Sequence, residues 1–169
     1  MVSIMSKFIL ETVTEELFER VLKIYNTNQE YFQISMNSKP SMKSVIEDKN
    51  AIPPDSCLEN KNYKLIILNG VDIGVIDYIV NYPDEDTIYI GLFMIDRNFN
   101  RNGYGREFIE EFITNMRNQR FNRIRLGVLN ENIKAFEFWT RMGFKVVKEV
   151  TSTIHPERNW KIKVMERRI

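Results

Sequence analysis

The chain has 169 residues, of which 43% are hydrophobic and 28% charged, and its formal net charge is +1. This composition excludes a disordered chain, and the small charge gives no electrostatic reason to expect a nucleic-acid or membrane partner. With one cysteine (Cys57), no signal-peptide pattern and no apolar run of bilayer length, we expect a cytoplasmic protein with a single domain, residues 1–169.

The first third of the chain is expected to hold one strand and two helices. The segment KFILETVT, residues 7–14, reads as a short strand, and Thr14 is a candidate cap for the helix that follows it. Apolar residues then recur at helical spacing: Leu17, Phe18, Val21, Leu22 and Tyr25. A weaker helix is expected over residues 42–48. The segment AIPPDSCLENKN, residues 51–62, is the clearest loop, because its paired prolines remove hydrogen-bond donors.

Three consecutive strands are expected from residue 63 onward. YKLIILNG (63–70) and VDIGVIDYIVNY (71–82) meet at Asn69-Gly70, a dipeptide typical of tight hairpin turns. The segment YPDED makes a second turn into TIYIGLFMID (87–96), which is largely apolar, as in a strand buried on both faces. These three strands are predicted to be antiparallel.

The rest of the chain alternates helices and strands. A helix follows the glycines in FNRNGYGREFIEEFITNM (99–116), and its apolar stripe comprises Phe108, Ile109, Phe112, Ile113 and Met116. RIRLGVL (123–129) is a strand, a second helix covers about 131–142, and Gly143 is expected to end it. FKVVKEVTS (144–152) and NWKIKVMERR (159–168) are two final strands, joined around His155 and Pro156. The order predicts an α/β fold about one mixed sheet.

Gly103 and Gly105 open the first of these two helices. A dinucleotide-binding fingerprint would need a third glycine where Phe108 stands, and the Gly-Lys-Ser/Thr of a Walker loop is absent. What remains is a helix N-terminus with free N–H groups and flanking arginines, an arrangement that favours an anion such as a phosphate. Alternatively, the glycines only relieve backbone strain, which is the better interpretation of a lone G-x-G.

A second motif decides between these interpretations. Residues 100–105 read N-R-N-G-Y-G, and residues 132–144 read N-I-K-A-F-E-F-W-T-R-M-G-F. Together they resemble the two signatures of the GNAT superfamily of acetyl-CoA-dependent N-acetyltransferases, over about residues 87–145. The resemblance implies a mixed, mostly antiparallel sheet flanked by helices, whose splayed central strands hold coenzyme A between them. It also implies acetyl-CoA as co-substrate and no metal.

The resemblance assigns roles by position. The backbone N–H of Phe93 is expected to hold the thioester carbonyl, where negative charge develops when an amine attacks, and Ile95 is expected to hold the pantetheine arm. The N–H groups around Arg101, Gly103, Gly105 and Arg106 are expected to hold the pyrophosphate. The side chain of Asn132 is expected to meet the pantetheine arm. The full set of expected coenzyme-binding residues is Phe93, Met94, Ile95, Asn100, Arg101, Asn102, Gly103, Tyr104, Gly105, Arg106, Asn132, Ala135, Phe138 and Trp139.

Two positions depart from the family pattern. Asn100 replaces the usual Arg or Gln, and Arg101 is a candidate to compensate. Trp139 stands where many members carry a tyrosine that protonates the departing thiolate. An indole N–H does not give up a proton at useful pH, so either another group donates or the thiolate leaves unassisted. Core packing is the better interpretation of Trp139.

An attacking amine must also lose a proton. Tyr89 and Gly91 are expected to share a face with Phe93 by the period of two, but neither is an acid or a histidine. Asp77 is a candidate base if the hairpin pairs it near Gly91, and Tyr89 is a second candidate catalytic residue. A structural Asp at a strand edge and deprotonation through ordered water stay open as alternatives.

The acceptor is expected to be an amine of a small molecule or a peptide. Tyr31 and Phe32 are either pocket or core residues, with core preferred. A homodimer is plausible because the terminal strands are exposed. The main alternative function is a catalytically weak module of the same fold that binds or senses coenzyme A. A different nucleotide-binding enzyme is disfavoured by Phe108 and by the motif at Asn132.

Overall fold

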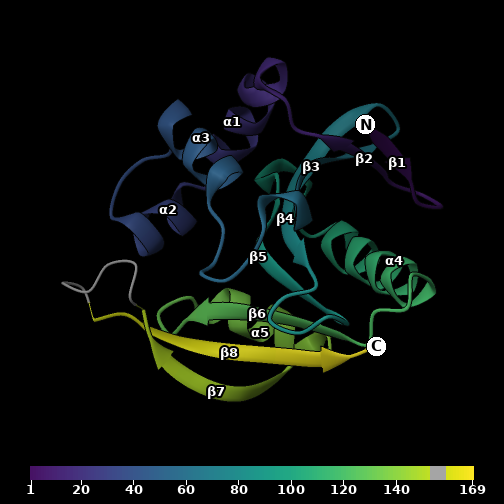
Figure 1. Ribbon diagram of the computed structural model, residues 1–169. Coiled ribbons are helices and arrows are strands. Elements are labelled where there is room, and N and C mark those ends of the chain that lie inside the picture. Colours follow the sequence, from purple (N-terminus) through teal and green to yellow (C-terminus); the bar gives the residue numbers. More distant parts are fainter. Residues whose placement is uncertain (153–158) are drawn as a thin grey trace.

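The computed structural model describes residues 1–152 and 159–169, and its centre is an eight-stranded sheet (Figure 1). The order of strands is β1-β2-β3-β4-β5-β6-β8-β7, and every neighbouring pair is antiparallel except β5 and β6. The strands are β1 (Val2–Ile4), β2 (Ile9–Thr12), β3 (Lys61–Leu68), β4 (Val71–Val80), β5 (Thr87–Ile95), β6 (Arg123–Leu129), β7 (Lys145–Thr151) and β8 (Lys161–Arg168). The predicted α/β class with a mixed, mostly antiparallel sheet is confirmed.

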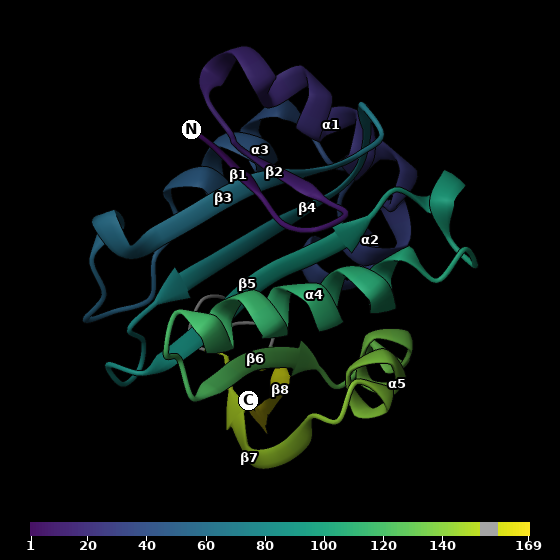
Figure 2. The same ribbon diagram turned by 90° about the vertical axis from the view of Figure 1, so that its right-hand side faces the viewer.

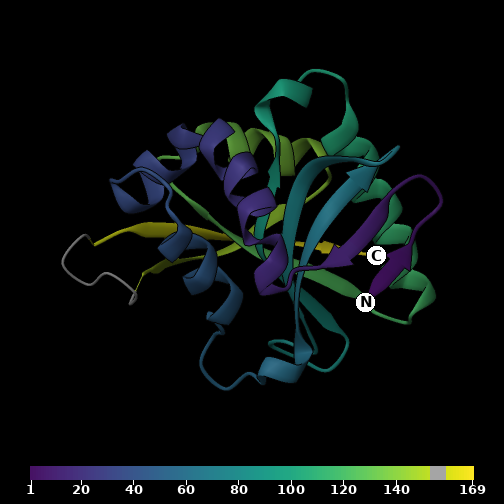
Figure 3. The same cartoon turned by 90° about the horizontal axis from the view of Figure 1, so that it is seen from above.

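Five helices pack on the two faces of this sheet. They are α1 (Phe18–Thr27), α2 (Gln29–Met36), α3 (Met42–Asn50), α4 (Tyr104–Asn118) and α5 (Ile133–Arg141). Helices α4 and α5 cover one face, and α1 to α3 lie on the other (Figure 2). Seen from above, the N-terminal helices and α4 lie on different sides of β3 and β4 (Figure 3). Short 3-10 turns at η1 (Glu15–Leu17), η2 (Leu58–Asn60) and η3 (Arg97–Phe99) complete the described elements.

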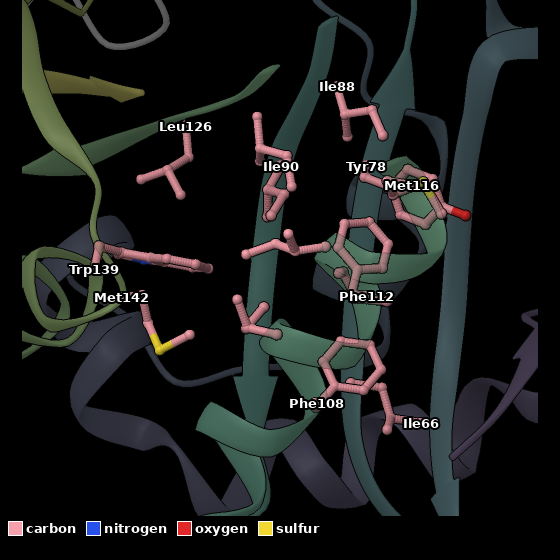
Figure 4. Close-up of a cluster of buried hydrophobic side chains, with 14 of the residues drawn as sticks. Ile66, Tyr78, Ile88, Ile90, Phe108, Phe112, Met116, Leu126, Trp139 and Met142 are labelled. Atoms are coloured by element: carbon pink, nitrogen blue, oxygen red, sulfur yellow. The ribbon is translucent and has the colours of Figure 1, made fainter. Parts of the chain in front are cut away.

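Each face of the sheet has its own hydrophobic core. The apolar stripe predicted for α4 is fully buried under the sheet, and Figure 4 shows Phe108, Phe112 and Met116 packed toward the strands. Trp139 and Met142 reach the same core from the region of α5 (Figure 4). On the other face, Val21, Ile24 and Tyr25 of α1 pack with Val45 of α3 on β3, β4 and β5. The sheet is therefore packed on both faces, with one hydrophobic core between it and each layer of helices.

The two parallel central strands separate part-way along their length. Residues 87–90 of β5 pair with residues 123–126 of β6, and the pairing ends there, although both strands continue. Beyond that point β5 stays paired with β4, and β6 stays paired with β8. The sheet therefore opens between β5 and β6, as the resemblance implied.

A β-bulge lies where the two strands separate. Asp77 pairs with Leu92 and Tyr78 pairs with Ile90, so Gly91 is an extra residue on β5. An extra residue exchanges the two faces of a strand beyond it. Ile90 and Phe93 accordingly pack on the same core, with α4, although they are three residues apart. Simple alternation along β5 therefore fails at Gly91.

Several predicted details need correction or completion. Thr14 makes no side-chain capping bond; it precedes the 3-10 turn η1, and its carbonyl accepts from the N–H of Leu17. Strand β1 and helix α2 were not predicted. The Asn69-Gly70 turn and the end of α5 at Gly143 are confirmed by positive φ angles. Strands β7 and β8 pair as a hairpin, but His155 and Pro156 lie outside the described residues.

None of the described helices has the length and apolar character needed to cross a membrane.

Candidate active site

Backbone groups of β5 face the opening in the sheet. The N–H of Asp96 donates to the carbonyl of Ile73 at 2.8 Å. This bond shows which residues of β5 direct their backbone N–H and C=O groups toward β4. Because ladder bonds alternate along an antiparallel strand, the N–H and C=O groups of Phe93 and Ile95 point away from β4, into the opening. The carbonyl of Ile95 accepts there from Nδ2 of Asn28 at 3.0 Å. The N–H of Phe93 therefore points into the opening, where it can donate to a bound ligand.

The glycine loop brings a helix N-terminus to the same opening. Gly103 is the N-cap of α4 and has a φ of +77°, a conformation that a side chain would strain. The first N–H groups of α4 have no partners within the helix and carry the positive end of its dipole. A Cβ at Gly105 would lie 3.5 Å from Ile95 and 3.7 Å from Phe138, on the wall of the opening. The loop therefore combines an anion site with a narrow apolar slot.

A pocket of about 520 Å³ fills the opening and is lined from both faces of the sheet. All the coenzyme residues expected from the sequence line it except Asn102 and Asn132. The lining residues that sequence reasoning did not assign to the coenzyme are Asn28, Tyr31, Phe99, Lys134 and Arg141. Tyr31 is thus a pocket residue, whereas Phe32 is buried core. No sequence signal indicated that α2 would reach the pocket.

The charged side chains that line this pocket are all cationic. Arg101, Arg106, Lys134 and Arg141 line it, and no carboxylate does among the described lining residues. Glu30 approaches Lys134 from α2, with Nζ at 2.8 Å and 2.9 Å from its carboxylate oxygens, and this pair bridges α2 and α5. A site with cations, helix-terminal amides and apolar walls fits a long ligand with an anionic end.

Asn132 lies beside this pocket rather than in its wall. Its Oδ1 accepts from the N–H of Ala135 at 3.2 Å, so the side chain caps α5. Asn132 lines a neighbouring pocket of about 400 Å³ between α2 and the start of α5. Asn28, Tyr31, Asn100 and Lys134 line both pockets, which are therefore adjacent.

Trp139 packs as a core residue at the inner end of the pocket. It is 6% exposed, and its ring centroid lies 5.0 Å from those of Phe138 and Phe144 and 5.8 Å from that of Phe93. Figure 4 shows the indole directed from α5 toward the central strands. The aromatic contacts favour the packing interpretation, and an indole N–H supplies no proton to a thiolate.

Asp77 is a buried carboxylate beside the bulge. A Cβ at Gly91 would lie 2.9 Å from its Oδ2, so the hairpin does pair Asp77 near Gly91. Nζ of the buried Lys61 lies 2.9 Å from both carboxylate oxygens but forms a hydrogen bond only with Oδ2, which leaves the buried Oδ1 without a hydrogen bond among the described residues. Burial raises the pKa of Asp77 to about 6, against the opposing effect of Lys61.

The expected placement of Tyr89 is wrong. Ile88 and Ile90 face the core under α4, so Tyr89 points to the opposite side of the sheet, whereas beyond the bulge Phe93 faces α4. The hydroxyl of Tyr89 lies near Gly127 of β6, 3.1 Å from where a Cβ would stand. Burial raises the pKa of this phenol, so it is uncharged at neutral pH.

A cluster of polar side chains, Tyr25, Tyr63 and Asp48, interacts with Asp77 electrostatically and was not predicted from the sequence. The hydroxyl of Tyr25 donates to Asp48 at 2.6 Å and also lies 2.6 Å from the hydroxyl of Tyr63. Burial raises the pKa of Asp48, and the charge of Asp48 in turn raises the pKa of Asp77. These residues come from α1, α3, β3 and β4, and no local motif connects them.

No group of three or more His, Cys, Asp or Glu side chains in the described ranges, 1–152 and 159–169, is placed to hold a metal ion.

Comparison with known proteins identifies the family of the chain. The model of the acetyltransferase (GNAT) family matches residues 18–144, which is most of the chain. The chain belongs to this family. The GNAT resemblance seen in the two sequence motifs is thereby confirmed. No curated protein matches the chain closely enough to count as a relative.

Solved structures of acetyltransferases have a similar fold. An acetyltransferase from Thermus thermophilus has a TM-score of 0.76 at 20% identity, over 96% of this chain and 97% of that one. The ribosomal-protein-S18-alanine N-acetyltransferase from Escherichia coli has a TM-score of 0.64 at 14% identity, over 96% and 94%. The Microcin C7 self immunity acetyltransferase MccE, solved with acetyl-CoA and AMP, has a TM-score of 0.71 at 17% identity, over 97% and 93%. At these identities the likeness shows the fold alone.

Proposed function

We propose that this GNAT protein transfers an acetyl group from acetyl-CoA directly to a primary amine. The observation that carries the proposal is the single pocket wall formed by the Phe93 backbone, the glycine loop and the cationic residues between the splayed strands. In this proposal the amine acceptor, either a small molecule or a peptide, binds on the other side of the same opening.

The pocket has the features that a coenzyme A molecule requires. Its anionic end fits the N-terminal amides of α4 together with Arg101 and Arg106. The slot past Gly105, between Ile95 and Phe138, suits an uncharged arm, and a Cβ at Gly105 would narrow it. Bound there, the co-substrate supplies the activated acetyl group. The residues proposed to bind coenzyme A are those expected from the sequence, except Asn102, which does not line the pocket. Asn132 lines the adjacent pocket instead.

Two groups of the chain do the chemical work in this proposal. The N–H of Phe93 donates to the carbonyl oxygen as negative charge develops on it, which stabilises the transition state. Asp77 takes one proton from the ammonium of the acceptor, so that the neutral amine attacks. The nitrogen loses its second proton as the carbon–sulfur bond breaks, and the thiolate takes up one proton. The products are an acetamide and a thiol, with one proton released to solvent.

Coupled measurements of product test this function. Free thiol from acetyl-CoA is measured with a panel of alkylamines, diamines, amino acids and peptides, and mass spectrometry checks for the added acetyl group. We expect thiol release that depends on an amine and matches the amount of N-acetyl product. Tight binding of acetyl-CoA without transfer to any amine in the panel would contradict the enzyme proposal and favour the alternative, a module that senses coenzyme A. The buried Trp139 in place of a proton-donating residue is the observation behind that alternative.

A further inference from the structure

Few side chains around the large pocket can give up a proton. Among the described residues that line it, those with a dissociable proton are Tyr31, Tyr104 and Lys134. The lining arginines stay protonated, and the indole of Trp139 gives up no proton at useful pH. A side chain that protonates a departing thiolate in this pocket is therefore one of these three.

Tyr104 and Lys134 are held at the outer side of the pocket. Tyr104 is the first residue of α4, directly after Gly103, and its ring centroid lies 5.4 Å from Nζ of Lys7. Lys134 is paired with Glu30, and its side chain is 75% exposed. Lys7 and Glu30 are themselves exposed. Tyr104 therefore belongs to the anion-binding end of the pocket, and Lys134 belongs to its solvent-facing rim.

Tyr31 reaches the pocket from α2, on the other face of the sheet. It lines the pocket together with Phe93, and its ring packs against the core between the N-terminal helices and the sheet. The carboxylates of Asp48 and Asp77 are close enough to act on its hydroxyl electrostatically. Asp77 pairs with Leu92, the residue before Phe93 on β5. The Tyr31 hydroxyl is therefore on the side of the pocket where the Phe93 N–H meets the opening.

The surroundings of Tyr31 keep its phenol uncharged. Burial raises the pKa of Tyr31, and the negative charge of Asp48 raises it further. A free phenolate is therefore disfavoured at this position. An uncharged hydroxyl donates one hydrogen bond and accepts others. It can pass a proton to one group while it receives a proton from another, and such a relay needs no phenolate.

We propose that Tyr31 is a catalytic residue that passes a proton to the sulfur of the departing coenzyme A. As the carbon–sulfur bond breaks, its electron pair stays on the sulfur, which takes the hydroxyl proton of Tyr31. The Tyr31 oxygen takes in exchange the second proton of the attacking nitrogen and ends uncharged. The first proton of the ammonium, accepted by Asp77, is the one released to solvent. The inference rests on the proposed function, since it completes the proton path in which Trp139 takes no part.

Binding of coenzyme A and of desulfo-coenzyme A, in which a hydrogen atom replaces the thiol group, tests the contact at the sulfur. Calorimetric titration at about pH 9, where most of the free thiol is ionised, needs no knowledge of the acceptor. We expect the wild-type protein to bind coenzyme A at least about tenfold more tightly than the desulfo form, because Tyr31 donates to the ionised sulfur. Tyr31→Phe should reduce this ratio about tenfold and leave the affinity for desulfo-coenzyme A unchanged.

A matched variant and a kinetic measurement complete the test. Tyr78→Phe also removes a buried phenol hydroxyl, but from the core under α4, and should change neither affinity. With any amine that the wild-type protein acetylates, Tyr31→Phe should lower kcat about 100-fold or more and leave KM for acetyl-CoA unchanged.

The outcomes separate this inference from the proposed function. An unchanged affinity ratio in Tyr31→Phe, or an unchanged kcat, overturns the inference while the coenzyme pocket stands. Loss of the ratio in Lys134→Met but not in Tyr31→Phe also overturns it, because the contact to the sulfur then belongs to Lys134. Failure of the wild-type protein to bind either form of coenzyme A overturns the proposed function itself.

Discussion

Asp77 combines burial in the sheet with a buried lysine partner, Lys61, whose Nζ lies 2.9 Å from both carboxylate oxygens. Its raised pKa means that the carboxylate becomes protonated near pH 6 rather than near 4. Its proton-accepting form is therefore available at neutral pH and is lost as the pH falls.

The pH dependence of turnover tests this role. With Asp77 as the base, kcat should fall as the pH drops through about 6, because the group that must accept the proton is already protonated. Asp77→Asn should lower kcat by about 100- to 10,000-fold and remove that acidic limb. Stopped measurements of thiol release from pH 5 to 9 check both effects. Asp72→Asn is the matched control, and an unchanged acidic limb in Asp77→Asn would contradict the assignment.

Gly105 allows stability and binding to be separated at one residue. It is the second residue of α4, and an added methyl would make ordinary contacts of 3.5 Å to 3.8 Å with Ile95 and Phe138. Gly105→Ala should therefore raise the free energy of unfolding by about 0.5–1 kcal/mol, because alanine favours a helix. The same methyl occupies the slot for the coenzyme and should weaken coenzyme A binding about tenfold or more.

Denaturant unfolding and calorimetric titration measure the two effects of Gly105→Ala. Thr114→Ala is the control, since it also replaces a residue on α4 with alanine but lies on its exposed side, away from the pocket. Unchanged coenzyme affinity in Gly105→Ala would show that the slot is not where the ligand passes.

At the level of elements, α4 depends on one apolar stripe for its position. Phe112 is fully buried and meets Tyr78 edge-on with ring centroids 5.0 Å apart. Phe112→Ala should lower the free energy of unfolding by about 3–5 kcal/mol, because it removes apolar contacts and leaves a cavity. Phe121→Ala, at a half-buried position after the helix, should cost clearly less. Urea denaturation of both variants gives the comparison, and equal losses would contradict the assignment of Phe112 to the core.

The joint between α1 and α2 is a second element that bears on the site. Asn28 donates through Nδ2 to the carbonyl of Ile95 and also lines both pockets. Asn28→Ala should cost about 1–3 kcal/mol of stability, because the Ile95 carbonyl loses this donor and the contacts of Nδ2 with Ile24 and Thr27 are lost as well. It should also raise KM for acetyl-CoA, because the end of β5, which lines the pocket, loses its hydrogen bond to Asn28. A variant with reduced stability but an unchanged KM would show that the tie is structural only.

Most of the order of helices and strands could be predicted from local sequence patterns. The spacing of apolar residues and the residues typical of turns can both be recognised within a few consecutive positions. The Asn69-Gly70 turn, the α4 stripe and the glycine at the end of α5 are of this kind. The bulge at Gly91 is not, since it is defined by pairing with β4, fourteen residues away. The error about Tyr89 follows directly from that bulge. Helix α2 was missed because its apolar face is short, and only Phe32 of this helix is fully buried.

At the scale of the whole molecule, the sequence predicted the lining of the large pocket better than the surroundings of Asp77. The glycine loop and the α5 motif are each a continuous stretch of sequence, so the motif resemblance indicated most of the residues that line the large pocket. Lys61 and Asp48 act on Asp77 from other elements, and only the tertiary fold brings them near it. The homodimer expected from exposed terminal strands stays a prediction, and sedimentation at several concentrations would test it.

The central claim is that the opening between β5 and β6 binds coenzyme A through the glycine loop. A thermal-unfolding titration with acetyl-CoA, coenzyme A, ATP and NADH, each at about 100 times the dissociation constant measured for coenzyme A, tests it most directly. A ligand at that concentration should add roughly 2.7 kcal/mol, which corresponds to a rise in Tm of about 5–11 °C for a chain of this size. We predict this rise with acetyl-CoA and coenzyme A and none of comparable size with ATP or NADH. No rise with either form of coenzyme A, or a larger rise with ATP or NADH, would contradict the account.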